Sequence, residues 1–131
     1  MGMKVLIIED TADNMYLMRY LLENDGHQVV EAADPQAGLA LAGAGGWSVI
    51  LLDIQLPGLD GYQLAPRIKT LPPCAAIPLI AVTSYAMAGD REKALAAGFD
   101  WYMEKPIQPD SFVSEIGAVV ESEDGKDPGR R

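Results

Sequence analysis

Cysteine and histidine each occur only once in the 131-residue chain, as Cys74 and His27. A single cysteine excludes an internal disulfide and is typical of a protein from a reducing compartment. A single histidine excludes a metal site built from several histidines. We interpret Cys74 as a small loop residue and His27 as a turn residue, so neither is a candidate for the chemistry of the protein.

Long hydrophobic runs and basic residues are also scarce. No apolar run approaches the length of about 18 residues that a membrane span needs. The first apolar run covers only residues 5–8 and ends in an acid pair, so we expect neither a signal peptide nor membrane insertion, and a cytoplasmic location. Ten basic residues against nineteen acidic ones give a net charge of −9, which argues against direct binding to nucleic acid.

Apolar runs that end in a polar residue are the main positive feature of the sequence. The runs cover residues 5–8, 49–52, 79–82 and 99–103, and they are followed by Glu9 and Asp10, by Asp53, by Thr83 and by Lys105. Continuous apolar runs without alternation predict strands that are buried on both faces. In open α/β sheets, functional groups gather beyond the carboxyl ends of the strands. Three acids, a hydroxyl and an ammonium at one edge suit a metal-assisted phosphoryl group on a carboxylate.

Helical patterns alternate with the apolar runs along the chain. We expect helices over residues 12–25, from 35 to the glycines after 43, up to about 70, over 90–97 and from 109 to about 120, with one further strand at 28–32. Pro66 should interrupt or shorten the third helix, and Asp90 is a candidate cap of the fourth. Such alternation predicts one α/β domain at 1–121, with a five-stranded parallel sheet in a three-layer α/β/α sandwich and a flexible polar tail at 122–131.

The residues at the strand ends also resemble a known family, the CheY-like receiver domains of response regulators. The matching motifs are Ile7-Ile8-Glu9-Asp10, Leu52-Asp53-Ile54-Gln55-Leu56-Pro57-Gly58-Leu59-Asp60-Gly61, Ala81-Val82-Thr83-Ser84 and Tyr102-Met103-Glu104-Lys105-Pro106. The resemblance covers about residues 3–120. Asn14-Met15 and Tyr85-Ala86-Met87 make the chain similar to the stand-alone, DivK-like type.

The resemblance implies a flavodoxin-like strand order, 2-1-3-4-5, and a role for each residue of the site. Asp53 would be the phosphoacceptor, and Thr83 and Lys105 would contact phosphoryl oxygens. An Mg²⁺ or Mn²⁺ ion would be held by Asp10, by Asp53, by the backbone carbonyl of Gln55 and, mostly through water, by Glu9. Thr83 and Tyr102 would move together as the switch, and the peptide bond before Pro106 would be cis.

The function that the resemblance implies is a phosphorylation-controlled switch of protein–protein interactions in a two-component phosphorelay. The donor would be a histidine kinase or a histidine phosphotransfer protein, and the output would be a downstream protein target. The chain would catalyse only its own phosphorylation and dephosphorylation, and it would be a monomer or a weak dimer. It is either free-standing or part of a hybrid kinase.

Three alternatives compete with this interpretation, and the first two belong to other classes of protein. A phosphatase of the haloacid-dehalogenase type also uses an aspartyl nucleophile, but it carries a second Asp two residues after the nucleophile that closes its first strand, where this chain has Ala12 after Asp10. A flavodoxin-like cofactor binder needs a phosphate-binding loop after the first strand, and no glycine-rich segment follows residues 5–8 here. A receiver that never gains phosphate does not fit the intact set of acids.

Overall fold

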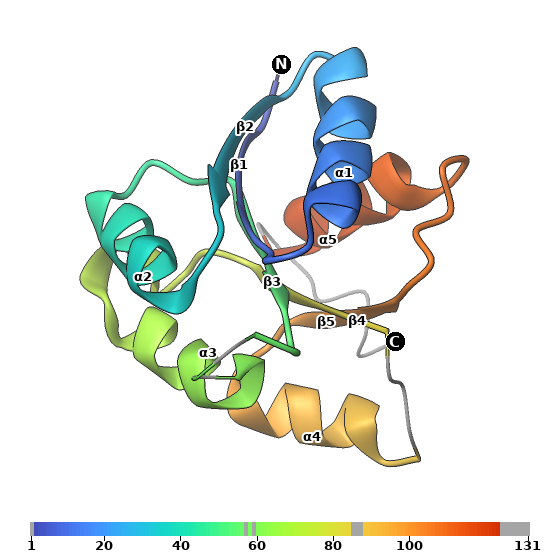
Figure 1. The fold of residues 1–131 in the computed structure, drawn as a ribbon. Helices are drawn as coiled ribbons and strands as arrows, with labels where there is room; N and C mark the ends of the chain where they lie inside the picture. The colour runs from blue at the N-terminus through green and yellow to red at the C-terminus, as the bar shows by residue number, and fades with distance from the viewer. Residues whose placement is uncertain (1, 57, 59, 85–87, 124–131) are drawn as a thin grey trace.

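Five short strands pair into one parallel sheet that is flanked by helices (Figure 1). The structure is a computed structural model, and it describes residues 2–56, 58, 60–84 and 88–123. The strands are β1 (Lys4–Ile8), β2 (Gln28–Ala32), β3 (Val49–Asp53), β4 (Leu79–Thr83) and β5 (Trp101–Glu104). The helices are α1 (Ala12–Asn24), α2 (Pro35–Ala44), α3 (Gly61–Thr70), the short 3₁₀ helix η1 (Pro72–Cys74), α4 (Asp90–Ala97) and α5 (Phe112–Glu123).

The strand order is β2-β1-β3-β4-β5, and all four pairs of neighbours are parallel. In the register of the sheet, Ile8 lies beside Leu52, Asp53 beside Val82, and Thr83 beside Glu104. The carboxyl ends of β1, β3, β4 and β5 therefore finish at one edge of the sheet. This arrangement confirms the predicted α/β/α sandwich and the flavodoxin-like order.

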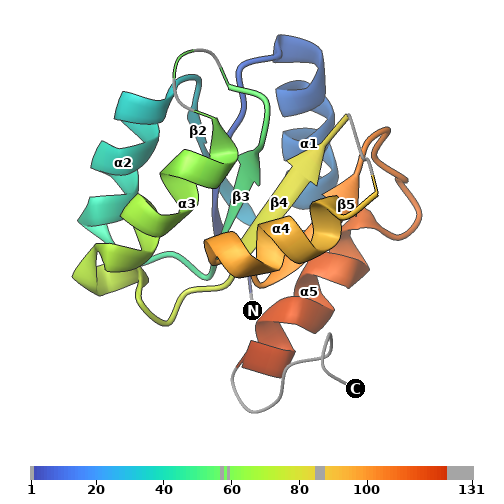
Figure 2. The ribbon, with the colours of Figure 1, turned by 90° about the horizontal axis from the view of Figure 1, so that it is seen from below.

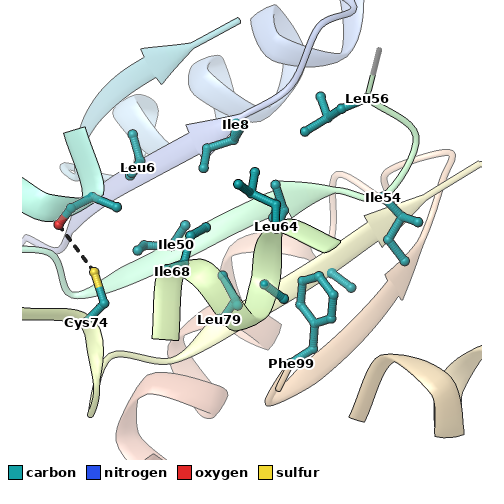
Figure 3. Close-up of a cluster of buried hydrophobic side chains, with 14 of the residues drawn as sticks. Leu6, Ile8, Ile50, Ile54, Leu56, Leu64, Ile68, Cys74, Leu79 and Phe99 are labelled. Carbon is teal, nitrogen blue, oxygen red and sulfur yellow. Dashed lines mark hydrogen bonds between the residues drawn. The ribbon is translucent and has the colours of Figure 1, made fainter. Parts of the chain in front are cut away.

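The helices form two layers, one on each face of the sheet (Figure 2). Met18 and Leu22 of α1 and Ile116 of α5 pack with Val5 and Val49 of the sheet on one face. The other face is covered by α2, α3 and α4. Its core contains the large side chains drawn in Figure 3, where the Cys74 thiol donates a hydrogen bond to the Ala42 carbonyl oxygen at 3.3 Å. Burial on both faces explains why β1, β3 and β4 are continuous apolar runs in the sequence.

Helix α3 continues through Pro66, so the predicted interruption is wrong. Proline removes only one backbone hydrogen bond within the helix. The helix is held at its start by a capping box, in which the Asp60 side chain accepts from the Gln63 N–H and the Gln63 side chain accepts from the Asp60 N–H. Leu64 and Ile68 are buried on its inner face. The cap and the buried face together retain the helix around Pro66.

Three other boundaries differ from the sequence-based expectations. Gly89 is the N-cap of α4, and Asp90 is the first helical residue rather than a side-chain cap. Strand β5 begins at Trp101 instead of residue 99, because the N–H of Phe99 donates to the Ala94 carbonyl at the end of α4. Helix α5 begins at Phe112, after a turn over residues 109–111. Capping and turn hydrogen bonds of this kind shift an element's end without changing its type.

Two of the sequence-based interpretations fall partly outside the described residues. Helix α5 runs to Glu123, so the first two residues of the predicted tail at 122–131 are helical, and residues 124–131 lie outside the description. The motif at 85–87 and the positions 57 and 59 lie outside it as well. Every helix that the structure describes is too short or too polar to cross a bilayer.

Candidate functional site

The polar residues predicted to gather at one sheet edge follow strands that lie side by side. Glu9 and Asp10 follow β1, Asp53 is the last residue of β3, and Thr83 is the last residue of β4. Lys105 follows β5, and its backbone N–H donates to the Thr83 carbonyl at 2.7 Å. Parallel pairing in the order β1-β3-β4-β5 therefore places Asp53 between the acid pair on one side and Thr83 on the other.

The three carboxylates form a compact group. One carboxylate oxygen from each of Glu9, Asp10 and Asp53 lies within 4.8 Å of the others. Glu9 and Asp53 are buried, whereas Asp10 is exposed. Hard divalent cations such as Mg²⁺ prefer oxygen ligands of this kind, and a site open on one side retains the waters that Mg²⁺ keeps. The donor set present in the structure therefore fits such an ion.

The Lys105 ammonium lies against the buried side of this acidic group. Its Nζ is 2.8 Å from Glu9 Oε1 and 3.6 Å from Asp53 Oδ2, and the Lys105 side chain is only 7% exposed. Glu9 also accepts a hydrogen bond from the Thr11 N–H at 3.1 Å. The ion pair between Glu9 and Lys105 was not predicted from the sequence. One sequence feature could have predicted it: Glu9 directly follows a buried strand, and a buried carboxylate needs a positive charge beside it.

The pKa of the Asp53 carboxyl is raised from 3.8 to about 7. Burial of the carboxyl is the main cause, and the negative charge of Glu9 adds to it. The Lys105 charge and the hydrogen bond from the Gln55 N–H to Asp53 Oδ1, at 3.0 Å, act in the opposite direction. The net negative charge around a buried acid is a further reason for a cation to bind here.

The Gln55 side chain contacts the end of β4, which the sequence did not predict. Its Nε2 lies 2.7 Å from Thr83 Oγ1, and its Oε1 lies 3.0 Å from the same hydroxyl oxygen. The sequence-based interpretation assigned the backbone carbonyl of Gln55 as a metal ligand, and that role remains a prediction. A polar side chain two residues after a strand-end acid is the only sequence signal for this contact.

Tyr102 lies on β5, in the core that α2, α3 and α4 cover, and not in the acidic group itself. Its side chain is buried, and its hydroxyl has no hydrogen-bond partner within the part of the chain that the structure describes. Burial raises the pKa of this hydroxyl, and the negative charges of Asp90 and Glu104 add to the effect. The peptide bond between Lys105 and Pro106 is cis, as the resemblance implied.

Comparison with known proteins agrees with this geometry. Residues 5–117 match the response regulator receiver domain family. The chain is 36% identical over 120 residues to the polar-differentiation response regulator DivK of Brucella anthropi, covering 92% of this chain and 98% of DivK. It is 33% identical over 117 residues to the protein PilH of Pseudomonas aeruginosa, covering 89% of this chain and 97% of PilH.

A solved structure adds a likeness in three dimensions. The receiver domain of a sensor histidine kinase from Pseudomonas aeruginosa, solved with a magnesium ion coordinated in its active-site cleft, superposes with a TM-score of 0.80 at 30% identity. The match covers 96% of this chain and 100% of that one. The fold and the strand-end acids define a CheY-like receiver. The chain belongs to the response regulator receiver domain family of two-component systems.

Proposed function

We propose that Asp53 accepts a phosphoryl group from a phosphohistidine on a histidine kinase or a histidine phosphotransfer protein, and that phosphorylation changes how the chain binds another protein. The observation that carries this proposal is the central place of Asp53. The acids that follow β1 lie on one side of it and Thr83 lies on the other, while the Lys105 ammonium is 2.8 Å from Glu9 and 3.6 Å from Asp53. A phosphoryl group on Asp53 would therefore meet a cation site and two hydrogen-bond donors at once.

In the proposed transfer, a carboxylate oxygen of Asp53 attacks the phosphorus of the donor. An O–P bond forms as the P–N bond of the phosphohistidine breaks, and the imidazole nitrogen leaves with the electron pair and takes up a proton. The Lys105 ammonium and the Thr83 hydroxyl donate to the phosphoryl oxygens, where negative charge accumulates. Hydrolysis of the acyl phosphate by water returns the carboxylate, so the chain turns over only its own modification.

Glu9, Asp10, Asp53 and the backbone carbonyl of Gln55 are the groups proposed to hold Mg²⁺, or Mn²⁺ in its place. When bound, the ion supplies positive charge that offsets the repulsion between the carboxylates and an incoming phosphoryl group. Two like charges 4 Å apart repel by about 4 kcal/mol at an effective dielectric of 20, so three carboxylates beside the Lys105 ammonium still oppose the approach of a further anion.

The proposed switch couples Thr83 to Tyr102. The hydroxyl of Thr83 moves toward the phosphoryl group, and the Tyr102 side chain fills the space beside β4 that Thr83 leaves. Both side chains are buried and lie on neighbouring strands, which supports the coupling. Since such a change shifts the populations of two states, the unphosphorylated chain samples the active form as well.

Incubation with a small phosphodonor tests the phosphoacceptor. In the presence of Mg²⁺, the wild-type chain should gain one phosphoryl group, as measured by intact mass and by base-labile label, and chelation with EDTA should abolish the gain. Asp53→Asn should gain none. Asp34→Asn is the matched control, because Asp34 caps α2 at an exposed position and asparagine caps equally well.

Label that persists at the wild-type level in Asp53→Asn would show that the acceptor is another residue. Multiple turnover of a phosphate ester would instead support a phosphatase of the haloacid-dehalogenase type.

Helix α1 is the proposed docking face for the phosphohistidine donor, together with the edge near Pro106. Tyr16 is 71% exposed and Tyr20 is 54% exposed, and their rings stack on the surface of α1 with centroids 6.3 Å apart. Exposed aromatic side chains supply large contact areas in interfaces. Tyr16→Ser/Tyr20→Ser should slow transfer from a panel of purified histidine kinases and leave the rate with a small phosphodonor unchanged.

A further inference from the structure

The side chain of Gln55 forms hydrogen bonds that connect the phosphoacceptor strand to the end of β4. Its Nε2 donates to Thr83 Oγ1 at 2.7 Å, and its Oε1 accepts from the Thr83 hydroxyl at 3.0 Å and from the Ser84 N–H at 3.3 Å. The backbone N–H of the same residue donates to Asp53 Oδ1 at 3.0 Å. Gln55 is therefore in contact with the phosphoacceptor on one side and with the switch threonine on the other.

A threonine hydroxyl carries a single proton. In this structure the Thr83 hydroxyl donates that proton to Gln55 Oε1, at a position where the threonine is only 1% exposed. Donation to a phosphoryl oxygen on Asp53 requires the same proton. The Gln55 amide and the phosphoryl group are therefore competing acceptors for the Thr83 hydroxyl.

We infer that Gln55 is a positioning residue, whose side-chain amide retains the Thr83 hydroxyl in the resting state and must release it before the phosphorylated state forms. The inference rests on the proposed function of Asp53 and Thr83. Because Oε1 also accepts from Ser84, release loosens the first residue after β4 together with the hydroxyl. Gln55 thereby sets how readily the chain enters its active state, without touching the transferred group.

Removal of the amide should favour the phosphoryl-bound state. A net intramolecular hydrogen bond changes an equilibrium by about two- to tenfold, equivalent to about 0.4–1.4 kcal/mol. This shift toward the phosphoryl-bound state should appear only when the Thr83 hydroxyl is present, because that hydroxyl is the group that the amide releases. Loss of general packing at Gln55 would act equally with and without the hydroxyl.

A double-mutant cycle with beryllofluoride separates these two cases. Beryllofluoride mimics a phosphoryl group on a carboxylate and is not hydrolysed, so its apparent dissociation constant in Mg²⁺, measured by titration calorimetry, reports the equilibrium alone. We expect Gln55→Met to bind it about two- to tenfold more tightly than wild type. In a Thr83→Val background the same change should alter the constant by less than about twofold.

Gln55→Ala is a second variant that keeps the test valid if methionine packs poorly, and Gln28→Met is the control at an exposed amide on β2. Two outcomes would overturn the inference about Gln55 and leave the proposed function standing. One is an equal change of the dissociation constant in the wild-type and Thr83→Val backgrounds, and the other is weaker binding of beryllofluoride by both Gln55 variants with Thr83 intact. Failure of the wild-type chain to bind the probe, or equal binding by Asp53→Asn, would overturn the proposed function and this inference with it.

Discussion

Burial of Asp53 makes stability depend on pH in the absence of metal. The folded chain binds the Asp53 proton more tightly than the unfolded chain, because the pKa is raised from 3.8 to about 7. The contribution of this tighter proton binding to the free energy of unfolding is fully present below about pH 4 and is lost as the pH rises through 7. Asparagine at position 53 mimics the neutral acid. The free energy of unfolding of Asp53→Asn should therefore exceed that of wild type by about 1 kcal/mol at pH 4.5 and by about 2–4 kcal/mol at pH 8.

Urea unfolding in EDTA at both pH values measures this difference. Asp34→Asn removes the same charge from an exposed position and is the control, so the change between the two pH values should be larger for Asp53→Asn than for Asp34→Asn. If the difference in the free energy of unfolding between Asp53→Asn and wild type is the same at both pH values, Asp53 is not the group that causes the pH dependence.

The ion pair between Glu9 and Lys105 leads to a second prediction at the same scale. Lys105→Met leaves the Glu9 carboxylate, whose side chain is 1% exposed, without its ammonium partner. Breaking a buried pair in this way should lower the free energy of unfolding by about 3 kcal/mol in EDTA. The double variant Glu9→Gln/Lys105→Met should recover most of that loss. Urea unfolding of the four chains tests the coupling, and strictly additive effects would show that the pair contributes nothing.

At the scale of elements, the start of α3 is packed directly against the end of β3. A Cβ added at Gly61 would lie 2.7 Å from the Ile54 Cα and 3.1 Å from the Asp53 carbonyl oxygen. Gly61→Ala should therefore displace the backbone after Asp53, lower the free energy of unfolding by about 2 kcal/mol and slow phosphorylation.

Gly117 in α5 provides the matched control, because nothing lies within 4 Å of a Cβ added there. Gly117→Ala should stabilise the chain by about 0.5–1 kcal/mol, since alanine loses less backbone entropy in a helix. Thermal unfolding of both variants measures the contrast. Equal effects of the two substitutions would contradict the close approach of α3 to β3.

The type of each helix or strand was predicted better from the sequence than its first and last residues, because different interactions determine the type and the ends. Burial of β1, β3 and β4 on both faces produces apolar runs that are visible without any structure. The continuation of α3 through Pro66 depends on the capping box at Asp60 and on the packing of Leu64 and Ile68, which act together only in the fold. The start of β5 at Trp101 depends on a hydrogen bond between Phe99 and the end of α4.

The same distinction holds within the site. Strand-end positions placed Asp53, Thr83 and Lys105 together, because parallel strands in a known order end at one edge. Which atoms then pair depends on side-chain directions that no spacing encodes. The contact between Lys105 and Glu9 and the contact between Gln55 and Thr83 are of this second kind.

At the scale of the whole molecule, Trp101 offers a signal that connects the site to the surface. It lies between the two helices that flank β5, with the Arg91 guanidinium of α4 4.9 Å from its ring and with its Nε1 donating to Glu115 of α5 at 2.6 Å. A movement of α4 on phosphorylation would change the charge around this indole. Binding of beryllofluoride with Mg²⁺ should therefore alter the tryptophan fluorescence.

Trp101→Phe should abolish that change, whereas Trp47→Phe should retain it. Trp47 is buried, and its Nε1 donates to the Leu41 carbonyl of α2, a helix that packs beside β1 and β2 rather than beside β5. A response that survives in Trp101→Phe would show that the altered surface lies elsewhere than beside β5.

Glu9 and Lys105 are 96 positions apart in the chain, and they meet only when the first and last strands are both in place. A ribosome must therefore add every residue up to Lys105 before the two charges can neutralise each other. A copy in which β5 is missing, or has not joined the sheet, leaves the Glu9 carboxylate without the Lys105 ammonium beside it, and it should be a poor acceptor of phosphate. The proposed ability to accept a phosphoryl group should therefore arise only once β5 has joined the sheet.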